Sequence, residues 1–384
     1  MKIAFIGQKG IPTKQGGIEK HVEELSQRLA ELGFDIFVYS RPHYTGESAK
    51  SYKFGNVNLI SLPSIKTKHL DAITHTFFSS LHALRQDYDI IHYHGVGPAL
   101  LSWIPRVFKP QAKVIVTFHC LDRQHQKWGA FAKFMLGLGE RAACQFPDET
   151  IVISKALQKY CKYNYNHKAK YIPNGVTINV PDQDILAATE ILKEFNLEPQ
   201  GYIVAISRLV RHKGVHTLIK AYNGVTTGKK LVIVGDSSNS DSYVSEVKEL
   251  AKDNPNIIFT GQQTGAKLEA LFRNSYLFVQ PSEAEGLSIA LLEAMAYQIP
   301  VIISNIEENQ EAAEGLALEF VNKSPEDLKR KIQYAVDNQD IIEALARRAR
   351  ERAAQEYDWD KIAKETALTY QSLVELAVLE PATK

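Results

Sequence analysis

The feature that most constrains the fold is a repeated alternation of short apolar segments with longer stretches whose apolar residues recur at helical spacing. Near the start, residues 2–6 and 34–40 have the β-branched and aromatic composition of strands, and residues 18–32 between them have a helical pattern. A strand, a helix and a second strand in this order form a parallel βαβ unit. Because the alternation continues along the chain, it predicts an α/β fold.

The alternation occurs in two series, one in each half of the chain. In the second half, predicted helices separate predicted strands at residues 202–206, 230–234, 257–260, 276–280 and 301–304. A chain of 384 residues exceeds one comfortable core, and the turn sequence Ile172-Pro-Asn-Gly-Val176 lies between the two series. We predict two Rossmann-like, doubly wound domains, residues 1–176 and 177–356, and a final helix with a tail at 357–384 that returns to the first domain.

The two halves carry opposite charge. Residues 1–180 hold 23 Lys and Arg against 13 Asp and Glu, whereas the remaining residues hold 22 against 31. A basic half is compatible with a nucleic acid, an anionic membrane, a phosphorylated substrate or a solvated surface. Because the other half is acidic and no nucleic-acid recognition motif occurs, we expect no nucleic acid as a partner.

Three cysteines without metal-ligand spacing indicate a reducing compartment. The apolar run at the start is too short for a signal peptide, and no run approaches the length that spans a membrane. These features predict a cytoplasmic protein.

Two carboxylates in the second half flank a predicted transition from strand to helix. Glu285 lies in the turn after the strand at 276–280, and Glu293 lies about two turns into the helix that is predicted from Leu287. A helix N-terminus offers free N–H groups and a positive dipole to an anion such as phosphate. The simpler interpretation is that Glu285 favours the helix dipole and Glu293 is solvated.

A cluster of cations follows the strand at 202–206. Ser207-Arg208 is followed by Lys213-Gly214 in a domain that is otherwise acidic. Because the carboxyl ends of parallel strands meet at one edge of a sheet, this loop and the turn at Glu285 are expected to share the ligand-binding edge. The pattern therefore predicts a phosphate site.

The first domain has its own candidates at strand ends. Gly16-Gly17 precedes the first predicted helix, but the spacing is not G-x-G-x-x-G, so a dinucleotide site is disfavoured. The pair allows either close approach of a ligand or a tight turn. His94 and His119 follow predicted strands and are either ligand-facing or structural. We find no convergent metal-ligand pattern and predict no metal site.

Three other segments need an interpretation. Asp87-Tyr-Asp89 precedes a strand, at the wrong sheet edge for a ligand, and is predicted to be a loop. The segment 123–141 is basic and aromatic and is either a core-facing helix or an interfacial membrane contact. In the predicted helix at 69–85 the following residues have core spacing: Leu70, Ile73, Phe77, Leu81 and Leu84.

Taken in order, these segments resemble the retaining glycosyltransferases of the GT-B class, of the glycosyltransferase family 4 type. The pair Glu285 and Glu293 is similar to their E-x7-E motif, and the loop of Arg208 and Lys213 is similar to their diphosphate-binding loop. The resemblance extends over nearly the whole chain, through these further segments: Gly16-Gly17 with Glu19, Thr117-Phe-His119, Ile172-Pro-Asn-Gly175 and Tyr357-Asp-Trp359.

The resemblance implies an interdomain cleft, an acceptor-binding first domain and a second domain that binds a nucleotide diphosphate-sugar. It implies that Glu293 holds the ribose, Glu285 the sugar hydroxyls, and His119 the sugar from the first domain. Arg208 and Lys213 would hold the diphosphate without a metal or cofactor. The implied donor-binding set also contains these residues: Gly16, Gly17, Ser207, Gly286, Leu287, Ser288 and Ile289.

The first domain, including Lys127-Trp-Gly129, is most similar to bacterial rhamnosyltransferase-like members that build surface polysaccharide or lipopolysaccharide. A glycan or a lipid-diphosphate-linked acceptor is implied, with peripheral contact at the anionic inner face of the membrane. Two departures are Leu287-Ser288 in place of Phe-Gly, and Gln298 in place of Gly. The alternatives are a sugar-nucleotide epimerase or phosphorylase of the same fold, and a non-catalytic sugar-nucleotide-binding protein.

Overall fold

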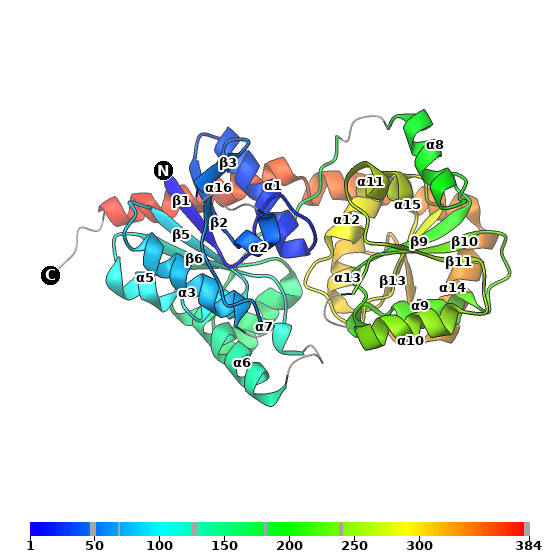
Figure 1. The fold of residues 1–384 in the computed structure, drawn as a ribbon, viewed down its shortest axis with the longest axis horizontal. Coiled ribbons are helices and arrows are strands. Elements are labelled where there is room, and N and C mark those ends of the chain that lie inside the picture. Colours follow the sequence, from blue (N-terminus) through cyan, green and yellow to red (C-terminus); the bar gives the residue numbers. More distant parts are fainter. Residues whose placement is uncertain (47–50, 68–69, 125–128, 180–182, 238–240, 380–384) are drawn as a thin grey trace. The chain divides into compact units, whose positions relative to one another are not determined.

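The computed structural model describes residues 1–46, 51–67, 70–124, 129–179, 183–237 and 241–379. The chain divides into two compact units. The first contains Met1–Gly175 and Trp359–Lys384, and the second contains Val176–Asp358. The predicted domain boundaries, after residues 176 and 356, fall next to these divisions. Each unit is described by itself below (Figure 1).

In the described residues, the first unit is built on one eight-stranded sheet with the order β3-β4-β2-β1-β5-β6-β7-β8. Among the described strands of this unit, only the β3–β4 pair is antiparallel. The strands are β1 (Lys2–Ile6), β2 (Asp35–Ser40), β3 (Ser51–Phe54), β4 (Val57–Ser61), β5 (Ile90–His94), β6 (Lys113–Phe118), β7 (Glu149–Val152) and β8 (Lys170–Tyr171). Because β1 lies between β2 and β5, the strand order reverses there, as in a doubly wound sheet.

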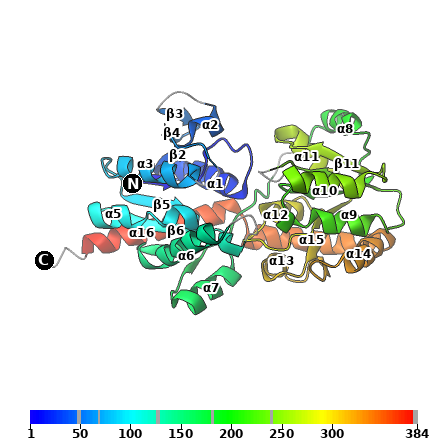
Figure 2. The same ribbon diagram turned by 60° about the horizontal axis from the view of Figure 1, so that its bottom comes forward.

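Helices cover both faces of this sheet (Figures 1 and 2). They are α1 (Gly17–Glu31), α2 (Pro42–Thr45), α3 (Asp71–Ala83), α4 (Val96–Ala99), α5 (Trp103–Phe108), α6 (Ala130–Gln145), α7 (Lys155–Tyr165) and α16 (Trp359–Leu379). The final helix, α16, packs on α1, as predicted for a helix that returns to the first domain. Its residues Trp359, Ile362 and Tyr370 belong to the same buried cluster as Ile3 and Phe5 of β1.

The second unit has a six-stranded parallel sheet in its described residues, with the order β11-β10-β9-β12-β13-β14. The strands are β9 (Tyr202–Ile206), β10 (Lys230–Val234), β11 (Ile257–Gly261), β12 (Leu277–Gln280), β13 (Val301–Ser304) and β14 (Leu318–Phe320). The helices are α8 (Ile185–Glu194), α9 (Val215–Tyr222), α10 (Asp241–Ala251), α11 (Gly265–Arg273), α12 (Ile289–Ala296), α13 (Glu307–Ala313), α14 (Pro325–Asp337) and α15 (Gln339–Glu356). Two doubly wound sheets confirm the predicted fold class.

The core-facing side of α3 was predicted wrongly at two positions. Leu70 and Phe77 are 45% and 42% exposed, whereas the buried face carries His75, Thr76 and Ser80. Two of the polar groups on this face have partners: Ser80 Oγ shares a hydrogen bond of 2.8 Å with the buried Tyr93 hydroxyl of β5, and Thr76 Oγ1 donates to the carbonyl of Ala72 at 2.8 Å. The other predicted core residues, Ile73, Leu81 and Leu84, are half-buried, so apolar spacing placed the core side of this helix only in part.

The D-x-D segment is a structural loop, as predicted. Asp89 accepts a hydrogen bond of 2.7 Å from the backbone N–H of Lys2, and Asp87 forms an ion pair of 2.6 Å with the Lys2 ammonium. Both carboxylates therefore anchor the start of β1. No helix in the described part of the chain is both long and apolar enough to cross a membrane.

Candidate functional site

The predicted phosphate loops of the second unit meet at the point where the strand order of its sheet reverses. Strands β9 and β12 are neighbours, with β10 and β11 on one side and β13 and β14 on the other. In open α/β sheets, ligands bind outside the carboxyl ends of the strands at such a point. The loop 207–214 follows β9 and the turn 281–288 follows β12, so both leave the sheet at the expected position.

An ion pair joins these two loops. Lys213 Nζ lies 2.5 Å from Glu285 Oε1, and the two side chains are only 17% and 8% exposed. Gln280, the last residue of β12, donates through Nε2 to the same carboxylate oxygen at 2.7 Å and to Ser282 Oγ at 3.0 Å. The carboxylate of Glu285 is thereby held in one orientation by a cation and an amide.

Two glycines allow the loops to come this close. Gly214 has φ +69°, and a Cβ there would overlap the carbonyl oxygen of Pro281. Gly235 follows β10 with φ +143°, and a Cβ there would overlap the carbonyl oxygen of Ser207. Positive φ costs glycine little. Backbone contact between the loops after β9, β10 and β12 therefore requires glycine at both positions.

Helix α12 begins at Ile289, two residues later than predicted, and Ser288 is its N-cap. The Ser288 hydroxyl accepts a hydrogen bond from the N–H of Leu291 at 3.3 Å. The first N–H groups of a helix have no carbonyl partner within the helix and can bind an anion. Gly286 and Leu287 are buried beside the helix start, and Glu293 is half-buried within the helix. The N-cap of α12 therefore follows Glu285 by three residues.

Arg208 and Gln298 complete the predicted set in this unit. Within the described residues, the half-buried Arg208 side chain has no ion pair or hydrogen bond, so its charge is free to meet a ligand. Gln298 stands where the family pattern has Gly, and its φ is +59°. Its N–H donates to Met295 at 3.0 Å at the end of α12. This departure therefore leaves a non-glycine residue in the left-handed region.

The sequence did not single out four residues beside this site: Glu283, His216, Lys323 and Glu308. Glu283 lies 3.6 Å from His216 Nε2 and 3.3 Å from Lys323 Nζ. Glu308, at the start of α13, is half-buried, and burial raises its pKa, with further contributions from neighbouring carboxylates that include Glu285. Helix α13 was not predicted, so no sequence signal connected Glu308 with Glu285.

The candidates of the first unit also lie at a reversal of strand order, between β1 and β5. Gly16 is the N-cap of α1 with φ +108°, and a Cβ there would overlap the carboxylate of Glu19. That carboxylate accepts from the Lys9 N–H at 3.1 Å. Glycine is therefore required at position 16 by the backbone and by Glu19. A Cβ at Gly17 would have no described atom within 4 Å, so the space beside Gly17 is open.

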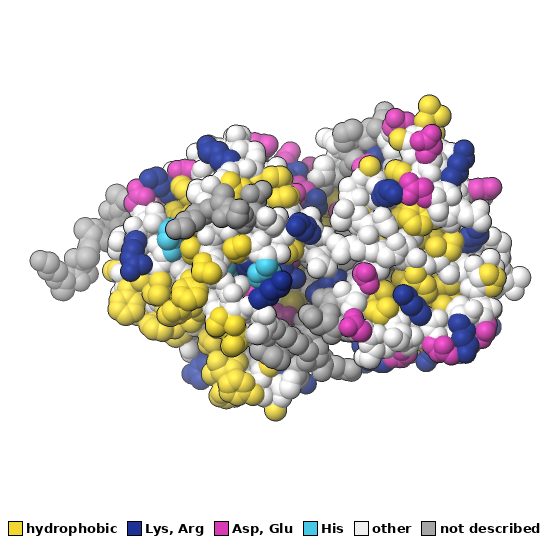
Figure 3. Space-filling model, in the orientation of Figure 1, with side chains coloured by type: hydrophobic (Ala, Val, Ile, Leu, Met, Phe, Trp, Pro, Cys, Tyr) yellow, Lys and Arg dark blue, Asp and Glu magenta, His cyan; other side chains and the backbone are white. Residues whose placement is uncertain are grey.

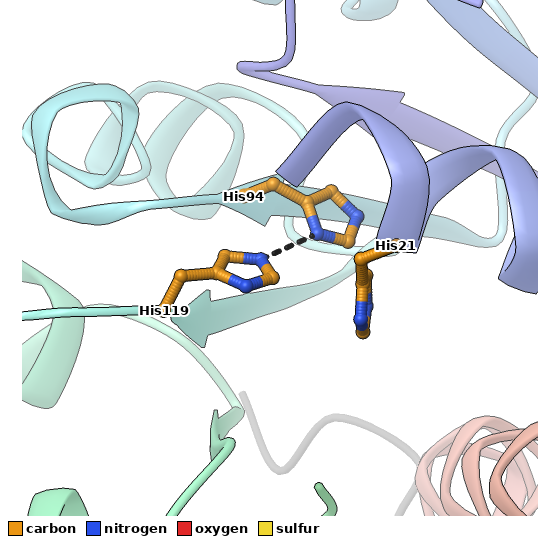
Figure 4. Close-up of side chains that lie close together, drawn as sticks. All are labelled: His21, His94 and His119. Atoms are coloured by element: carbon orange, nitrogen blue, oxygen red, sulfur yellow. Dashed lines mark hydrogen bonds between the residues drawn. The ribbon is translucent and has the colours of Figure 1, made fainter. Parts of the chain in front are cut away.

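His119 lies in a buried cluster with His94 and His21 (Figure 4). His94 Nδ1 and His119 Nε2 are 3.2 Å apart, and the rings of His21 and His119 meet edge to face with centroids 4.8 Å apart. His21 projects from α1, and its Nδ1 lies 2.9 Å from Asn174 Oδ1. The sequence had indicated His94 and His119, but the contribution of His21 was missed.

Burial keeps these imidazoles neutral. It lowers the pKa of His21 to about 4 and the pKa values of His94 and His119 well below the ordinary range. His92 lies on the same strand as His94, and both of its ring nitrogens are hydrogen-bonded, to the Tyr370 hydroxyl at 2.6 Å and to Thr117 Oγ1 at 2.7 Å. His92 is therefore a structural residue, whereas the other three retain unused nitrogen atoms.

The described residues of segment 123–141 test the first of its two interpretations, a core-facing helix. In α6 the buried face consists mainly of small residues, with Glu140, whereas Phe131 and Phe134 are 77% and 62% exposed. The aromatic side chains therefore do not face the core. Lys127 and Trp128 lie outside the described residues.

Known proteins share this architecture. Residues 15–180 match the family described as Glycosyltransferase Family 4, and residues 188–355 match Glycosyl transferases group 1. The chain is 28% identical to the GDP-mannose-dependent alpha-(1-6)-phosphatidylinositol monomannoside mannosyltransferase of Mycobacterium tuberculosis, over 93% of this chain and 94% of that protein. It is 27% identical to the O-antigen biosynthesis glycosyltransferase WclY of Escherichia coli, over 65% and 70%.

The structure of Anabaena HepE in complex with UDP and glucose has a TM-score of 0.80 to this chain, with 18% identity, over 97% of this chain and all of that one. Two doubly wound units with loops at both reversal points thus define the GT-B fold. The first unit contains the family 4-type match and the second the group 1 match. We identify the chain as a glycosyltransferase with a family 4-type first domain and a group 1 second domain.

Proposed function

We propose that this protein transfers a hexosyl-type sugar from a nucleotide diphosphate-sugar to an acceptor hydroxyl, with retention at the anomeric carbon. The observation that carries the proposal is the ion pair of Lys213 and Glu285 beside the N-terminus of α12, with Arg208 in the same loop as Lys213. A diphosphate leaving group gains negative charge as the glycosidic bond breaks. Fixed cations and a helix N-terminus can stabilise that charge without a metal ion.

In this proposal the Lys213–Glu285 ion pair is exchanged when the donor binds. Lys213 and Arg208 turn to the diphosphate, and Glu285 accepts hydrogen bonds from the sugar hydroxyls. Glu293 holds the ribose, while Ser207 and the backbone at 286–289 line the phosphate site. By the resemblance of the first domain, His119 and the loop at Gly16-Gly17 are proposed as further donor-binding residues.

The reaction is proposed as a displacement on one face of the sugar. The bond between the anomeric carbon and the phosphate oxygen breaks, and the acceptor oxygen forms its bond to the same face of that carbon. The departing phosphate oxygen takes the proton of the acceptor hydroxyl. Arg208 and Lys213 stabilise the leaving group through this step.

The test compares two arginines of one loop. We expect Arg208→Ala to lower the transfer rate about 100-fold or more, as loss of a fixed electrostatic stabiliser does. Arg211→Ala is the matched control, because Arg211 is 46% exposed and pairs with Glu246, and its rate is expected to stay close to that of the parent. Equal rates for all three proteins would contradict the proposed site.

Product analysis tests the stereochemistry and the metal requirement. NMR of the product is expected to show the anomeric configuration of the donor, and EDTA is expected not to lower the rate. An inverted anomer would exclude retention, and activity that returns only with Mn²⁺ would exclude metal-independent transfer. In the same assay without acceptor, a transferase forms no glycosylated product, whereas an epimerase still converts the sugar nucleotide. A phosphorylase is recognised by a sugar phosphate among its products. Donor binding without turnover would indicate a non-catalytic binding protein.

We propose synthesis of a bacterial surface polysaccharide or lipopolysaccharide as the setting, with a rhamnosyltransferase-like reaction. The support is the O-antigen role in the name of WclY and the resemblance of the first domain. The acceptor would be a glycan or a lipid-diphosphate-linked sugar. A thermal-shift panel of nucleotide sugars would identify the donor, because a ligand that binds only the folded state raises the unfolding temperature.

An exposed apolar surface favours contact of the cytoplasmic protein with the inner face of the membrane. Figure 3 shows hydrophobic side chains gathered over α3, α5 and α6. Their exposed members are Phe77, Phe78, Trp103, Val107, Phe108, Phe131, Phe134 and Leu138. Apolar patches of this kind on a basic domain suit an anionic lipid surface.

Vesicle sedimentation with matched variants tests the membrane contact. Phe131→Ser with Phe134→Ser is expected to lower binding to vesicles that contain anionic lipid. Ile185→Ser with Leu186→Ser is the control, because these α8 residues of the other unit are 78% and 79% exposed. Equal binding of both double variants, or no preference for anionic over neutral vesicles, would contradict this contact.

A further inference from the structure

The buried histidine cluster of the first unit has the composition of a transition-metal site. His21 of α1, His94 at the end of β5 and His119 after β6 are 4%, 1% and 5% exposed. Each offers one ring nitrogen, and these three atoms lie within 4.8 Å of one another. The rings come from three elements far apart in sequence, and in Figure 4 they face a common space.

Hydrogen bonds determine which nitrogen of His21 is available. The Asn174 side-chain oxygen can only accept, so the His21 Nδ1 beside it at 2.9 Å carries the proton. His21 Nε2 is then a bare lone pair, and it is buried without a hydrogen-bond partner. Metal-bound histidines usually donate their other N–H to an oxygen in this way, which fixes the tautomer.

His94 also has an unused nitrogen. Its Nε2 is buried and has no hydrogen-bond partner, while its Nδ1 lies 3.2 Å from His119 Nε2. For an ion shared with His119, the ligand atom of His94 is Nδ1, and the buried Nε2 then carries the proton. Nitrogen ligands of a tetrahedral zinc ion are about 3.3 Å apart, since each Zn–N bond is about 2.0–2.1 Å. The separation of 3.2 Å between His94 Nδ1 and His119 Nε2 already fits, and the ligand atom of His21 lies within 4.8 Å of the other two ligand atoms.

We propose that His21, His94 and His119 form a binding site for a divalent transition metal of the zinc class, with Asn174 orienting His21. Neutral imidazole is a preferred ligand of Zn²⁺, Co²⁺, Ni²⁺ and Cu²⁺, whereas Mg²⁺ and Ca²⁺ prefer oxygen. The depressed pKa values keep all three rings neutral at physiological pH. His92 is not a ligand, because both of its nitrogens are hydrogen-bonded.

Three histidine ligands leave one coordination position open. A metal would also engage His119, which the proposed function assigns to the donor sugar. This consequence rests on the proposed function: the bound metal would compete with that contact. Metal binding itself is measured without donor or acceptor, so a failure of the site is distinguishable from a failure of the transfer reaction.

The experiment titrates the full chain, stripped with EDTA, with Co²⁺ by visible absorption and with Zn²⁺ by calorimetry, using Mg²⁺ as the oxygen-preferring control. One ion per chain is expected, with a tetrahedral Co²⁺ spectrum. His21→Gln and His94→Gln are expected to abolish this binding. His167→Gln is the matched control, since His167 is a half-buried histidine of the same unit outside the cluster, and it should bind as the parent does.

Asn174→Ala is expected to weaken Zn²⁺ binding about 10- to 100-fold, because it removes only the group that orients a ligand. X-ray absorption of the unaltered zinc-loaded protein should show three imidazole ligands, and this measurement holds even where a histidine variant does not fold. Unchanged affinity in His21→Gln and His94→Gln, or a spectrum without imidazole scattering, would overturn the site.

Discussion

We predict that substitutions in the ion pair between Lys213 and Glu285 change the stability of the protein and its transfer activity independently. The pair is largely buried, with an Nζ–Oε1 distance of 2.5 Å. In the Lys213→Met variant, the Gln280 amide would be the remaining hydrogen-bond donor to Glu285 among the described residues. Removing one partner of a buried pair costs about 3–5 kcal/mol, and the partial exposure of Lys213 favours the lower end, about 3 kcal/mol.

The second substitution tests the cause of that loss. Glu285→Gln in the Lys213→Met background removes the uncompensated charge, so most of the lost free energy of unfolding should return. Transfer activity should stay low in both proteins, because the cation is absent in both. The assay is urea unfolding followed by circular dichroism, combined with initial transfer rates.

A surface pair provides the control. Lys267 and Glu194 form an ion pair whose side chains are 47% and 49% exposed, and Lys267→Met should cost under about 1 kcal/mol. The reasoning is refuted if Lys213→Met is no less stable than Lys267→Met. It is also refuted if the double substitution is as unstable as the sum of its two single substitutions.

Three further predictions concern single positions. Burial lowers the pKa of His21 in the folded protein to about 4. As the pH falls below 6.5, the imidazole is therefore protonated in the unfolded chain before it is protonated in the folded protein, and the free energy of unfolding should fall by about 3 kcal/mol towards pH 4. The urea midpoint of His21→Gln should depend less on pH than that of the parent protein, and an equal pH dependence of the two midpoints would refute the assignment. Gly16→Ala should lower the unfolding temperature, because Gly16 has a φ of +108° and a Cβ there would overlap Glu19. Gly17→Ala should leave the unfolding temperature unchanged but should weaken donor binding. Equal unfolding temperatures of the two variants would contradict this difference. Gln298→Gly should raise the free energy of unfolding by about 1 kcal/mol, since a non-glycine residue at φ +59° is strained; calorimetry that shows destabilisation would count against it.

Much of the fold follows from local pattern. The predicted strands at 2–6, 202–206, 230–234 and 301–304 have the same bounds as β1, β9, β10 and β13. These strands are buried on both faces, so each is a short and nearly continuous apolar run. Helices α13, α14 and α15 were not predicted.

The sequence alone was less informative about helix faces. In α3, spacing favoured Leu70 and Phe77 as core residues, but the structure buries His75 and Thr76 instead. Periodicity identifies an apolar side of a helix without showing what lies against it. Which side is buried depends on the neighbouring strand, and here Tyr93 of β5 supplies a polar partner to this face of α3.

By itself, the sequence determined two doubly wound domains and the loops at the carboxyl ends of their central strands, because strand order and right-handed connections place such loops at a reversal point. Only the tertiary structure decided which side chains of those loops meet. Lys213 and Glu285 are 72 residues apart in the sequence, and they form an ion pair. His21 of α1 lies beside His94 and His119, which come from other elements. Contacts between separate elements depend on packing distances of a few ångströms, which local propensity does not encode.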